Sequence, residues 1–131
     1  MTTLDSGIKV LVLEDTQELA EILVETLKGM NLQAESKSHG RPALELYEQL
    51  QPDLMMLDIA LPDMQGWKVL DAIKEKVHDN PNFKLPKVIV ITAYGDPANR
   101  LMGKLQDVAE YLIKPFTPTE IEKVVTRVMG L

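Results

Sequence analysis

Side chains that can bind metal ions or take part in chemistry stand at the ends of the apolar runs in this sequence. Glu14 and Asp15 end the first run, Asp58 ends another, and Thr92 and Lys114 end two later runs. In an open parallel sheet, ligands bind beyond the carboxyl ends of the strands, so these side chains are expected to converge. A single acid at a strand end often does no more than finish the strand, but the joint pattern favours a site.

The expected cluster contains three carboxylates, which repel one another when they are pressed together. Without compensation, the pKa of at least one carboxyl would rise and that group would take up a proton. A divalent cation relieves the repulsion, and carboxylate oxygens suit hard cations. The chain has no cysteine. Because it also lacks a plausible pair of histidines, Mg²⁺ or Mn²⁺ is favoured over zinc, and we expect magnesium.

A hydrated cation beside Asp58 prepares the cluster for phosphoryl transfer. This chemistry needs charge neutralisation and in-line positioning more than acid-base catalysis, and an aspartate can serve as the nucleophile. Lys114 and the Thr92 hydroxyl supply further neutralisation. The acyl phosphate product adds negative charge and acceptor oxygens, enough to draw Thr92 and its loop inward. The residues therefore predict a phosphoacceptor whose phosphorylation changes its conformation.

The strands that must position these side chains are predicted from continuous apolar runs at 8–13, 54–57 and 88–91, with weaker candidates at 32–36 and 110–113. Continuous runs are typical of strands that are buried on both faces. Apolar residues at helical spacing predict helices between the strands, the least amphipathic of them at about 97–105. Strand and helix alternate five times, which predicts an α/β doubly wound parallel sheet with helices on both faces.

The last predicted helix has the best-marked start. Thr117 and Glu120 have the spacing of a capping box, and Pro118 stands at the first helical position.

Composition restricts the class of protein. The chain has 131 residues, 45% of them hydrophobic and 26% charged, as expected for one globular domain. Its net charge of −6 argues against direct binding of nucleic acid. Neither a leader-like amino terminus nor a run of 18 apolar residues is present, so we expect no membrane span. The cytoplasm is the expected location, and the absence of cysteine fits a reducing compartment.

The motifs resemble, in their order, those of the response-regulator receiver family of two-component signalling, which includes a small chemotaxis regulator. The resemblance depends on the Glu14–Asp15 pair, the segment 58–66, the Thr92–Ala93 pair and the segment 111–116. It implies a flavodoxin-like five-stranded parallel sheet of order 2-1-3-4-5 with five helices. It also implies that residues 1–131 form a single receiver domain with a core of about 8–129.

The resemblance assigns roles to the acids. Asp58 would be the phosphoacceptor and, with Asp15, a direct metal ligand. Glu14 would act on the metal mainly through water, and the backbone carbonyl of Ala60 would complete the protein ligands.

The resemblance also assigns the remaining site residues. Thr92 and Lys114 would contact the phosphoryl oxygens, and the Lys114–Pro115 peptide would be cis. Tyr111 matches the switch aromatic, whose ring becomes buried when the threonine is drawn to the phosphoryl group. An ordinary half-buried strand tyrosine is the alternative interpretation of Tyr111.

The implied function is that of a switch rather than an enzyme acting on another substrate. A histidine kinase or a histidine phosphotransfer protein would donate the phosphoryl group, and the domain would catalyse its own phosphorylation and slow dephosphorylation. An output partner or a dimer mate would bind the face made by the helix at 97–105, the strand at 110–113 and the last helix, including Lys104, Tyr111 and Lys123.

The sequence departs from the family pattern at Asp107 and Val108, where family members usually carry a Gly-Ala pair. The end of the preceding helix must therefore close without glycine. Ala60 and Tyr94 occupy positions where the family tunes access of hydrolytic water. An apolar Ala60 and a screening Tyr94 lead to the hypothesis of a long-lived phosphorylated form.

Other functions fit the residues less well. A haloacid-dehalogenase-type phosphatase needs a second acid where Ala60 stands, and nucleotide-binding turns need glycines or a lysine where Glu14, Asp15 and Thr16 stand. A degenerate receiver that acts as a phosphorylation-independent scaffold remains an open alternative. The residues also leave open whether the domain stands alone or belongs to a longer regulator.

Overall fold

Strand and helix alternate five times along the chain in a computed structural model that describes residues 6–93 and 97–131, and this confirms the predicted alternation. The elements are β1 (Lys9–Leu13), α1 (Gln17–Gly29), β2 (Gln33–Lys37), α2 (Gly40–Leu50), β3 (Leu54–Asp58), α3 (Gly66–Asp79), β4 (Lys87–Thr92), α4 (Pro97–Leu105), β5 (Glu110–Ile113) and α5 (Pro118–Met129).

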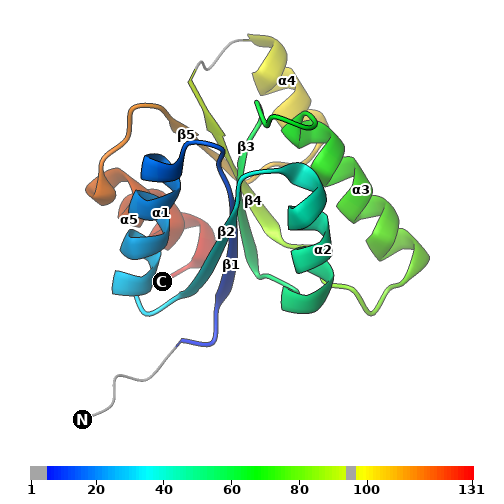
Figure 1. The fold of residues 1–131 in the computed structure, drawn as a ribbon, viewed down its shortest axis with the longest axis horizontal. Coiled ribbons are helices and arrows are strands. Elements are labelled where there is room, and N and C mark those ends of the chain that lie inside the picture. The colour runs from blue at the N-terminus through cyan, green and yellow to red at the C-terminus, as the bar shows by residue number, and fades with distance from the viewer. Residues whose placement is uncertain (1–5, 94–96) are drawn as a thin grey trace.

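The strands form one parallel sheet in the order β2-β1-β3-β4-β5. Figure 1 shows α1 and α5 on one side of this sheet and α2, α3 and α4 on the other. The architecture is the doubly wound, flavodoxin-like sandwich that the sequence predicts, with the strand order that the family resemblance implies.

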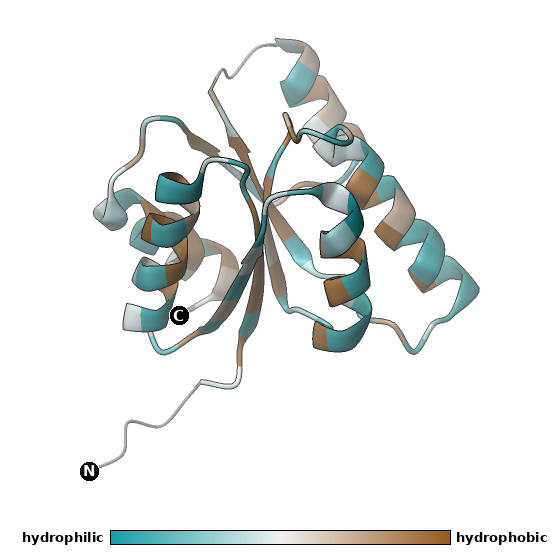
Figure 2. Cartoon of the chain, viewed as in Figure 1, coloured by the Kyte–Doolittle hydropathy of each residue, from teal (hydrophilic) through white to brown (hydrophobic). Residues whose placement is uncertain are grey.

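The continuous apolar runs are explained by two hydrophobic clusters, one on each side of the sheet. Val10 and Val12 belong to the cluster beneath α1 and α5, whereas Leu11 and Leu13 belong to the cluster beneath α2 and α3. Successive side chains of a strand point to opposite faces of the sheet. A strand covered on both faces is therefore apolar at every position. In Figure 2 the central strands are mainly hydrophobic, whereas the helices carry both hydrophilic and hydrophobic residues.

The predicted element bounds differ from the observed ones by about one residue. Two strands extend far enough to include Asp58 and Thr92 as their last residues, whereas the strand at 110–113 and the helix at 97–105 match their predicted ranges. The capping box at the start of α5 is formed, with the Thr117 side chain accepting a hydrogen bond from the Glu120 N–H.

The end of α4 closes without glycine, as predicted. Asp107 adopts a left-handed conformation with φ of 61°. Its N–H donates to the Lys104 carbonyl at 3.2 Å, and the Val108 N–H donates to the Gly103 carbonyl at 2.9 Å. These two bonds form a Schellman motif in which an aspartate takes the position usually held by glycine.

Among the helices in the described part of the chain, none is both long enough and apolar enough to cross a membrane.

Candidate functional site

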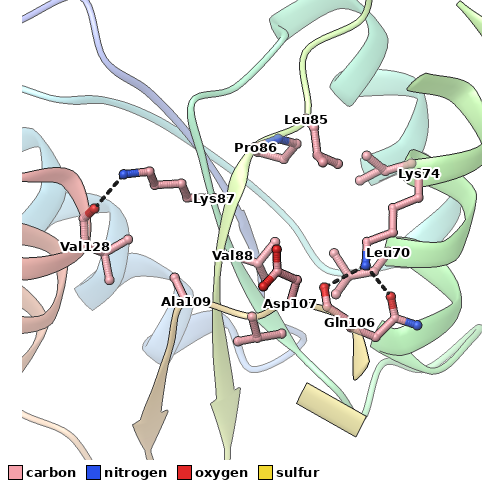
Figure 3. A pocket seen from close by; sticks show the side chains of 12 residues that line it. Leu70, Lys74, Leu85, Pro86, Lys87, Val88, Gln106, Asp107, Ala109 and Val128 are labelled. Carbon is pink, nitrogen blue, oxygen red and sulfur yellow. Dashed lines mark hydrogen bonds between the residues drawn. The ribbon is translucent and has the colours of Figure 1, made fainter. Parts of the chain in front are cut away.

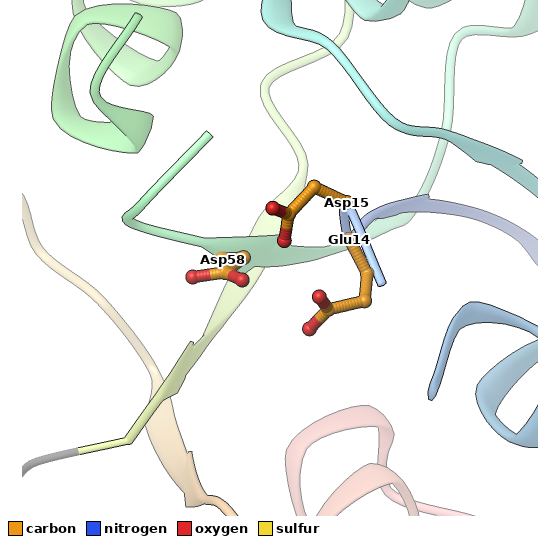
Figure 4. Close-up of side chains that lie close together, drawn as sticks. All are labelled: Glu14, Asp15 and Asp58. Atoms are coloured by element: carbon orange, nitrogen blue, oxygen red, sulfur yellow. The ribbon is translucent and has the colours of Figure 1, made fainter. Parts of the chain in front are cut away.

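The three acids predicted to converge lie together at the carboxyl edge of the sheet. Leu13 pairs with Leu57 in the register of β1 and β3, so the next residues, Glu14 and Asp58, lie side by side. Asp15 follows at the start of the loop to α1, and one carboxylate oxygen from each acid lies within 4.8 Å of the others. Figure 4 shows the three carboxylates gathered where β1 and β3 end.

Lys114 reaches this cluster from the far side of β4. Its Nζ lies 2.9 Å from Asp58 Oδ2 and 2.8 Å from Glu14 Oε1. The backbone N–H of Lys114 donates to the Thr92 carbonyl at 2.8 Å, which ties the end of β5 to the end of β4. The Lys114–Pro115 peptide is cis, as predicted. One ammonium is therefore shared between two of the three carboxylates.

Burial and the ion pair between Glu14 and Lys114 have opposite effects on the pKa values of these two side chains. Glu14 is only 1% exposed, and this burial raises the pKa of its carboxyl although the Lys114 contact opposes the rise. Burial alone would lower the pKa of Lys114, but its contacts with Glu14 and Asp58 outweigh that effect and raise it. The site thus holds more negative charge than its lysine balances.

The donor set fits a hard divalent cation. Among the described residues, Glu14 Oε1 is a buried side-chain oxygen whose close polar neighbour is the Lys114 ammonium, an ion-pair contact at 2.8 Å. Asp58 Oδ1 accepts from the Ala60 N–H at 3.0 Å, which fixes the orientation of that carboxylate. Carboxylate oxygens close together are ligands that suit a hard cation such as Mg²⁺.

A cavity of about 310 Å³ opens beside the acids. It is lined by Asp15, Asp58, Ile59, Ala60, Thr92, Ala93, Asn99 and Lys114. Thr92 is buried at the end of β4 and lines the cavity, and Ala60 lies at the cavity wall. Every residue predicted to bind metal or phosphoryl oxygens is therefore in the carboxylate cluster or lines the cavity. Tyr94 lies outside the described residues.

The loop after Asp58 is held in a tight turn and tied to a neighbouring helix. A Cβ atom on Gly66 would lie 2.5 Å from the Asp58 carbonyl oxygen, so only glycine fits there. Asp63 accepts from the Gly40 N–H at 2.7 Å and from the Arg41 N–H at 3.0 Å, and so caps α2 from outside that helix. Sequence reasoning missed this role of Asp63, although the residue lies inside the motif at 58–66.

The Tyr111 side chain extends from β5 and packs against α4. Its hydroxyl donates to the carbonyls of Asn99 at 3.2 Å and Arg100 at 3.4 Å. The Arg100 guanidinium carbon lies 5.8 Å from the centre of the Tyr111 ring. Sequence reasoning did not single out Asn99, because its place in the cavity depends on how α4 is turned relative to the sheet, which no local motif reveals.

A larger cavity, of about 580 Å³, lies at the opposite edge of the sheet, where β4 and β5 begin. Figure 3 shows Lys74 beside this cavity, with its ammonium donating to the backbone and side-chain oxygens of Gln106. Its lining contains neither a cluster of acids nor any of the predicted site residues. The chemistry is therefore assigned to the smaller cavity at the carboxyl edge.

Comparison with known proteins finds one family and many relatives that match nearly the whole chain. The response regulator receiver domain family matches residues 10–126. The chemotaxis protein CheY of Thermotoga maritima is 32% identical over 124 residues, which cover 93% of this chain and 98% of that protein. The crystal structure of the Vibrio cholerae chemotaxis protein CheY4 superposes with a TM-score of 0.83 at 25% identity, covering 92% of this chain and 98% of that one.

Longer proteins also match. The transcriptional regulatory protein PcoR of Escherichia coli is 32% identical over 113 residues, which cover 86% of this chain but 47% of PcoR. The chain thus spans less than half the length of the transcriptional regulators that it matches.

Proposed function

Because the chain belongs to the response regulator receiver domain family, we propose that it receives a phosphoryl group on Asp58 from a histidine kinase or a histidine phosphotransfer protein. The observation that carries this assignment is the convergence of three carboxylates and the Lys114 ammonium on a cavity at the carboxyl edge of the sheet. Asp58 and Glu14 each accept a backbone N–H and contact Lys114, but of these two acids Asp58 is the one that lines the cavity.

In the transfer step, a carboxylate oxygen of Asp58 attacks the phosphorus of the donor in line with the leaving group. An oxygen–phosphorus bond forms as the nitrogen–phosphorus bond of the phosphohistidine breaks, and the imidazole nitrogen keeps the electron pair. Lys114 lies 2.9 Å from Asp58 and is placed to neutralise charge on the phosphoryl oxygens as they arrive. The domain itself thus supplies the catalysis.

Asp15 and Asp58 are the proposed direct ligands of Mg²⁺, with Glu14 acting mainly through water and the Ala60 carbonyl as a further ligand. The burial of Glu14 and the excess of three carboxylates over one lysine support a divalent cation here. When bound, the ion would neutralise the carboxylates and the incoming phosphoryl oxygens. Mn²⁺ has the same ligand preferences and would also be accepted.

Thr92 and Tyr111 are the proposed switch residues. The Thr92 hydroxyl would contact the phosphoryl group, and Tyr111 would respond to the movement of the loop that follows Thr92. The burial of Thr92 at the cavity and the packing of Tyr111 on α4 support these roles. Phosphorylation then shifts the population between two conformations.

The output face is proposed to be α4, β5 and α5, including Lys104, Tyr111 and Lys123. Exposed apolar side chains support a partner or a dimer mate there, since Leu101 is 60% exposed and Leu105 is 72% exposed on α4, and Ile113 is 40% exposed on β5. Residues 1–131 would act as a single receiver domain in the cytoplasm, and any contact with nucleic acid would belong to another domain or partner.

The experiment that tests the function is intact-mass analysis after incubation with acetyl phosphate, with and without Mg²⁺. We expect one phosphoryl group to be added in a Mg²⁺-dependent manner, and none to be added to Asp58→Asn. A wild-type protein that binds Mg²⁺ but gains no mass would favour the scaffold alternative, which the intact set of acids and lysine does not favour.

A further inference from the structure

Asn99 touches three parts of the molecule at once. It lies in the first turn of α4 and lines the same cavity as Asp58 and Lys114. Its side-chain Oδ1 accepts a hydrogen bond from Trp67 Nε1 at 3.3 Å, and its backbone carbonyl accepts the Tyr111 hydroxyl at 3.2 Å. The cavity beside Asp58, the start of α3 and the edge strand β5 therefore all contact this residue.

The bond to Trp67 fixes the orientation of the Asn99 amide. An indole N–H can only donate, so the amide oxygen must face Trp67, and the amide NH₂ forms the other branch of the side chain. Trp67 is 7% exposed and belongs to the hydrophobic cluster beneath α2 and α3, so it is a fixed anchor. The group that Asn99 can offer to a ligand in the cavity is therefore a hydrogen-bond donor.

A donor at this place suits the phosphorylated site better than the unphosphorylated one. An acyl phosphate carries strong acceptor oxygens and added negative charge, whereas the unmodified Asp58 already has donors on both oxygens, from Ala60 and Lys114. The Asn99 amide is neutral. It can therefore donate to a phosphoryl oxygen, yet it adds no positive charge beside the carboxylates before phosphorylation. Its hydrogen bond to a charged oxygen is stronger than one between neutral groups.

We propose that the Asn99 side-chain NH₂ binds an oxygen of the phosphoryl group on Asp58, and that this contact ties the phosphorylated site to α4 and Tyr111. The inference rests on the proposed function of Asp58. Because the Asn99 carbonyl holds the Tyr111 hydroxyl, any shift of Asn99 towards the phosphoryl group also changes the seat of that ring.

The test compares affinities for beryllofluoride, an anion that becomes tetrahedral when a carboxylate oxygen coordinates it and so mimics a phosphoryl group, by calorimetry in saturating Mg²⁺. Asn99→Asp keeps the size of the side chain and an oxygen for Trp67 but replaces the donor with a carboxylate. Asn99→Ala removes both. Asn82→Asp makes the same change of charge at an exposed position in the loop between α3 and β4 and serves as the control.

We expect Asn99→Asp and Asn99→Ala to bind beryllofluoride about tenfold more weakly or worse, as the loss of a hydrogen bond to a charged group predicts, and Asn82→Asp to bind it normally. Mg²⁺ alone should bind Asn99→Asp at least as tightly as wild type, because the change adds negative charge. Anion affinity of Asn99→Ala within about twofold of wild type would overturn the inference, whatever Asn99→Asp does, because the added carboxylate by itself repels the anion. Equal loss of Mg²⁺ and anion binding would overturn it too, because that pattern indicates structural damage.

Failure of the proposed function has a different signature from failure of this inference. A wild-type protein that binds no beryllofluoride and gains no phosphoryl group would overturn both. A wild type that does bind it, with Asn99 variants that bind equally well, overturns only the role of Asn99.

Discussion

The Tyr111 hydroxyl occupies the space beside Gly103 where the side chain of any other residue would begin. A Cβ atom on Gly103 would lie 1.5 Å from the Tyr111 hydroxyl oxygen, much closer than any non-bonded contact allows. Gly103 is buried in the last turn of α4, and within a helix glycine costs up to about 1 kcal/mol relative to alanine. Because Gly103 has no side chain, the Tyr111 ring can pack on α4 and its hydroxyl can reach the carbonyls of Asn99 and Arg100.

Gly103→Ala is expected to expel the Tyr111 ring from α4 while leaving the protein folded. The loss of packing and of one hydrogen bond is offset by the better helix propensity of alanine, so stability should change by no more than about 1 kcal/mol. Burial raises the pKa of Tyr111 above the usual value of 10.0. Ultraviolet titration should therefore show this pKa moving back towards 10.0 in Gly103→Ala.

Two matched variants complete that experiment. Tyr111→Phe identifies the Tyr111 signal among the three tyrosines of the chain. Gly29→Ala, at the end of α1, places a methyl group where no atom lies within 4 Å, and should leave the tyrosine titration unchanged. An unaltered titration of Tyr111 in Gly103→Ala would show that the helix, and not the ring, moves to make room.

Asp107→Gly is expected to stabilise the protein by roughly 0.5–1 kcal/mol. Asp107 closes α4 with φ of 61°, a conformation that is costly for residues with a Cβ atom and open to glycine. The two backbone bonds of the Schellman motif do not involve its side chain and should persist. Urea denaturation measures the effect, with Asp107→Ala as the opposite control, which should destabilise. Equal stability of the glycine and alanine variants would contradict the assignment of backbone strain to this position.

Asp63→Asn is expected to lower the thermal midpoint of unfolding at neutral pH, with a difference from wild type that shrinks in acid. Hydrogen bonds from the N–H groups of Gly40 and Arg41 hold the pKa of Asp63 below its usual value of 3.8. A carboxyl with a lowered folded-state pKa contributes stability above its unfolded-state pKa and loses it as the pH falls through the folded value. The difference should be full above about pH 5 and should decline below about pH 4.

Thermal melts across that range check this prediction for the cap of α2. Asp79→Asn removes an exposed carboxylate at the carboxyl end of α3 and is the charge-matched control. A difference between Asp63→Asn and wild type that stays constant down to the lowest pH would argue that the ionised carboxylate does not cap the helix.

The sequence predicted the edge of the sheet that holds the site, because each site residue ends or follows an apolar run. The position of Asp58 beside Glu14 follows from the strand order and needs no side-chain detail. The cap from Asp63 to Gly40 joins residues 23 apart in sequence, and nothing local to either residue indicates it. The same holds for the bond between Trp67 and Asn99, which depends on how two helices are turned towards each other.

Lys114→Met is expected to separate metal binding from phosphorylation. In the structure, the ammonium lies 2.8 Å from Glu14 Oε1 and 2.9 Å from Asp58 Oδ2, so it competes with a cation for those carboxylates. Its removal should make Mg²⁺ bind at least roughly several-fold more tightly, because two buried carboxylates lose the cation that competes with the metal. Phosphorylation by acetyl phosphate should nevertheless become at least about tenfold slower, because a charge that stabilises the transferred group is lost.

Mg²⁺ titration by calorimetry and intact-mass kinetics measure the two effects on the same sample. Weaker Mg²⁺ binding in Lys114→Met would show that the lysine positions the acids for the metal instead of competing with it.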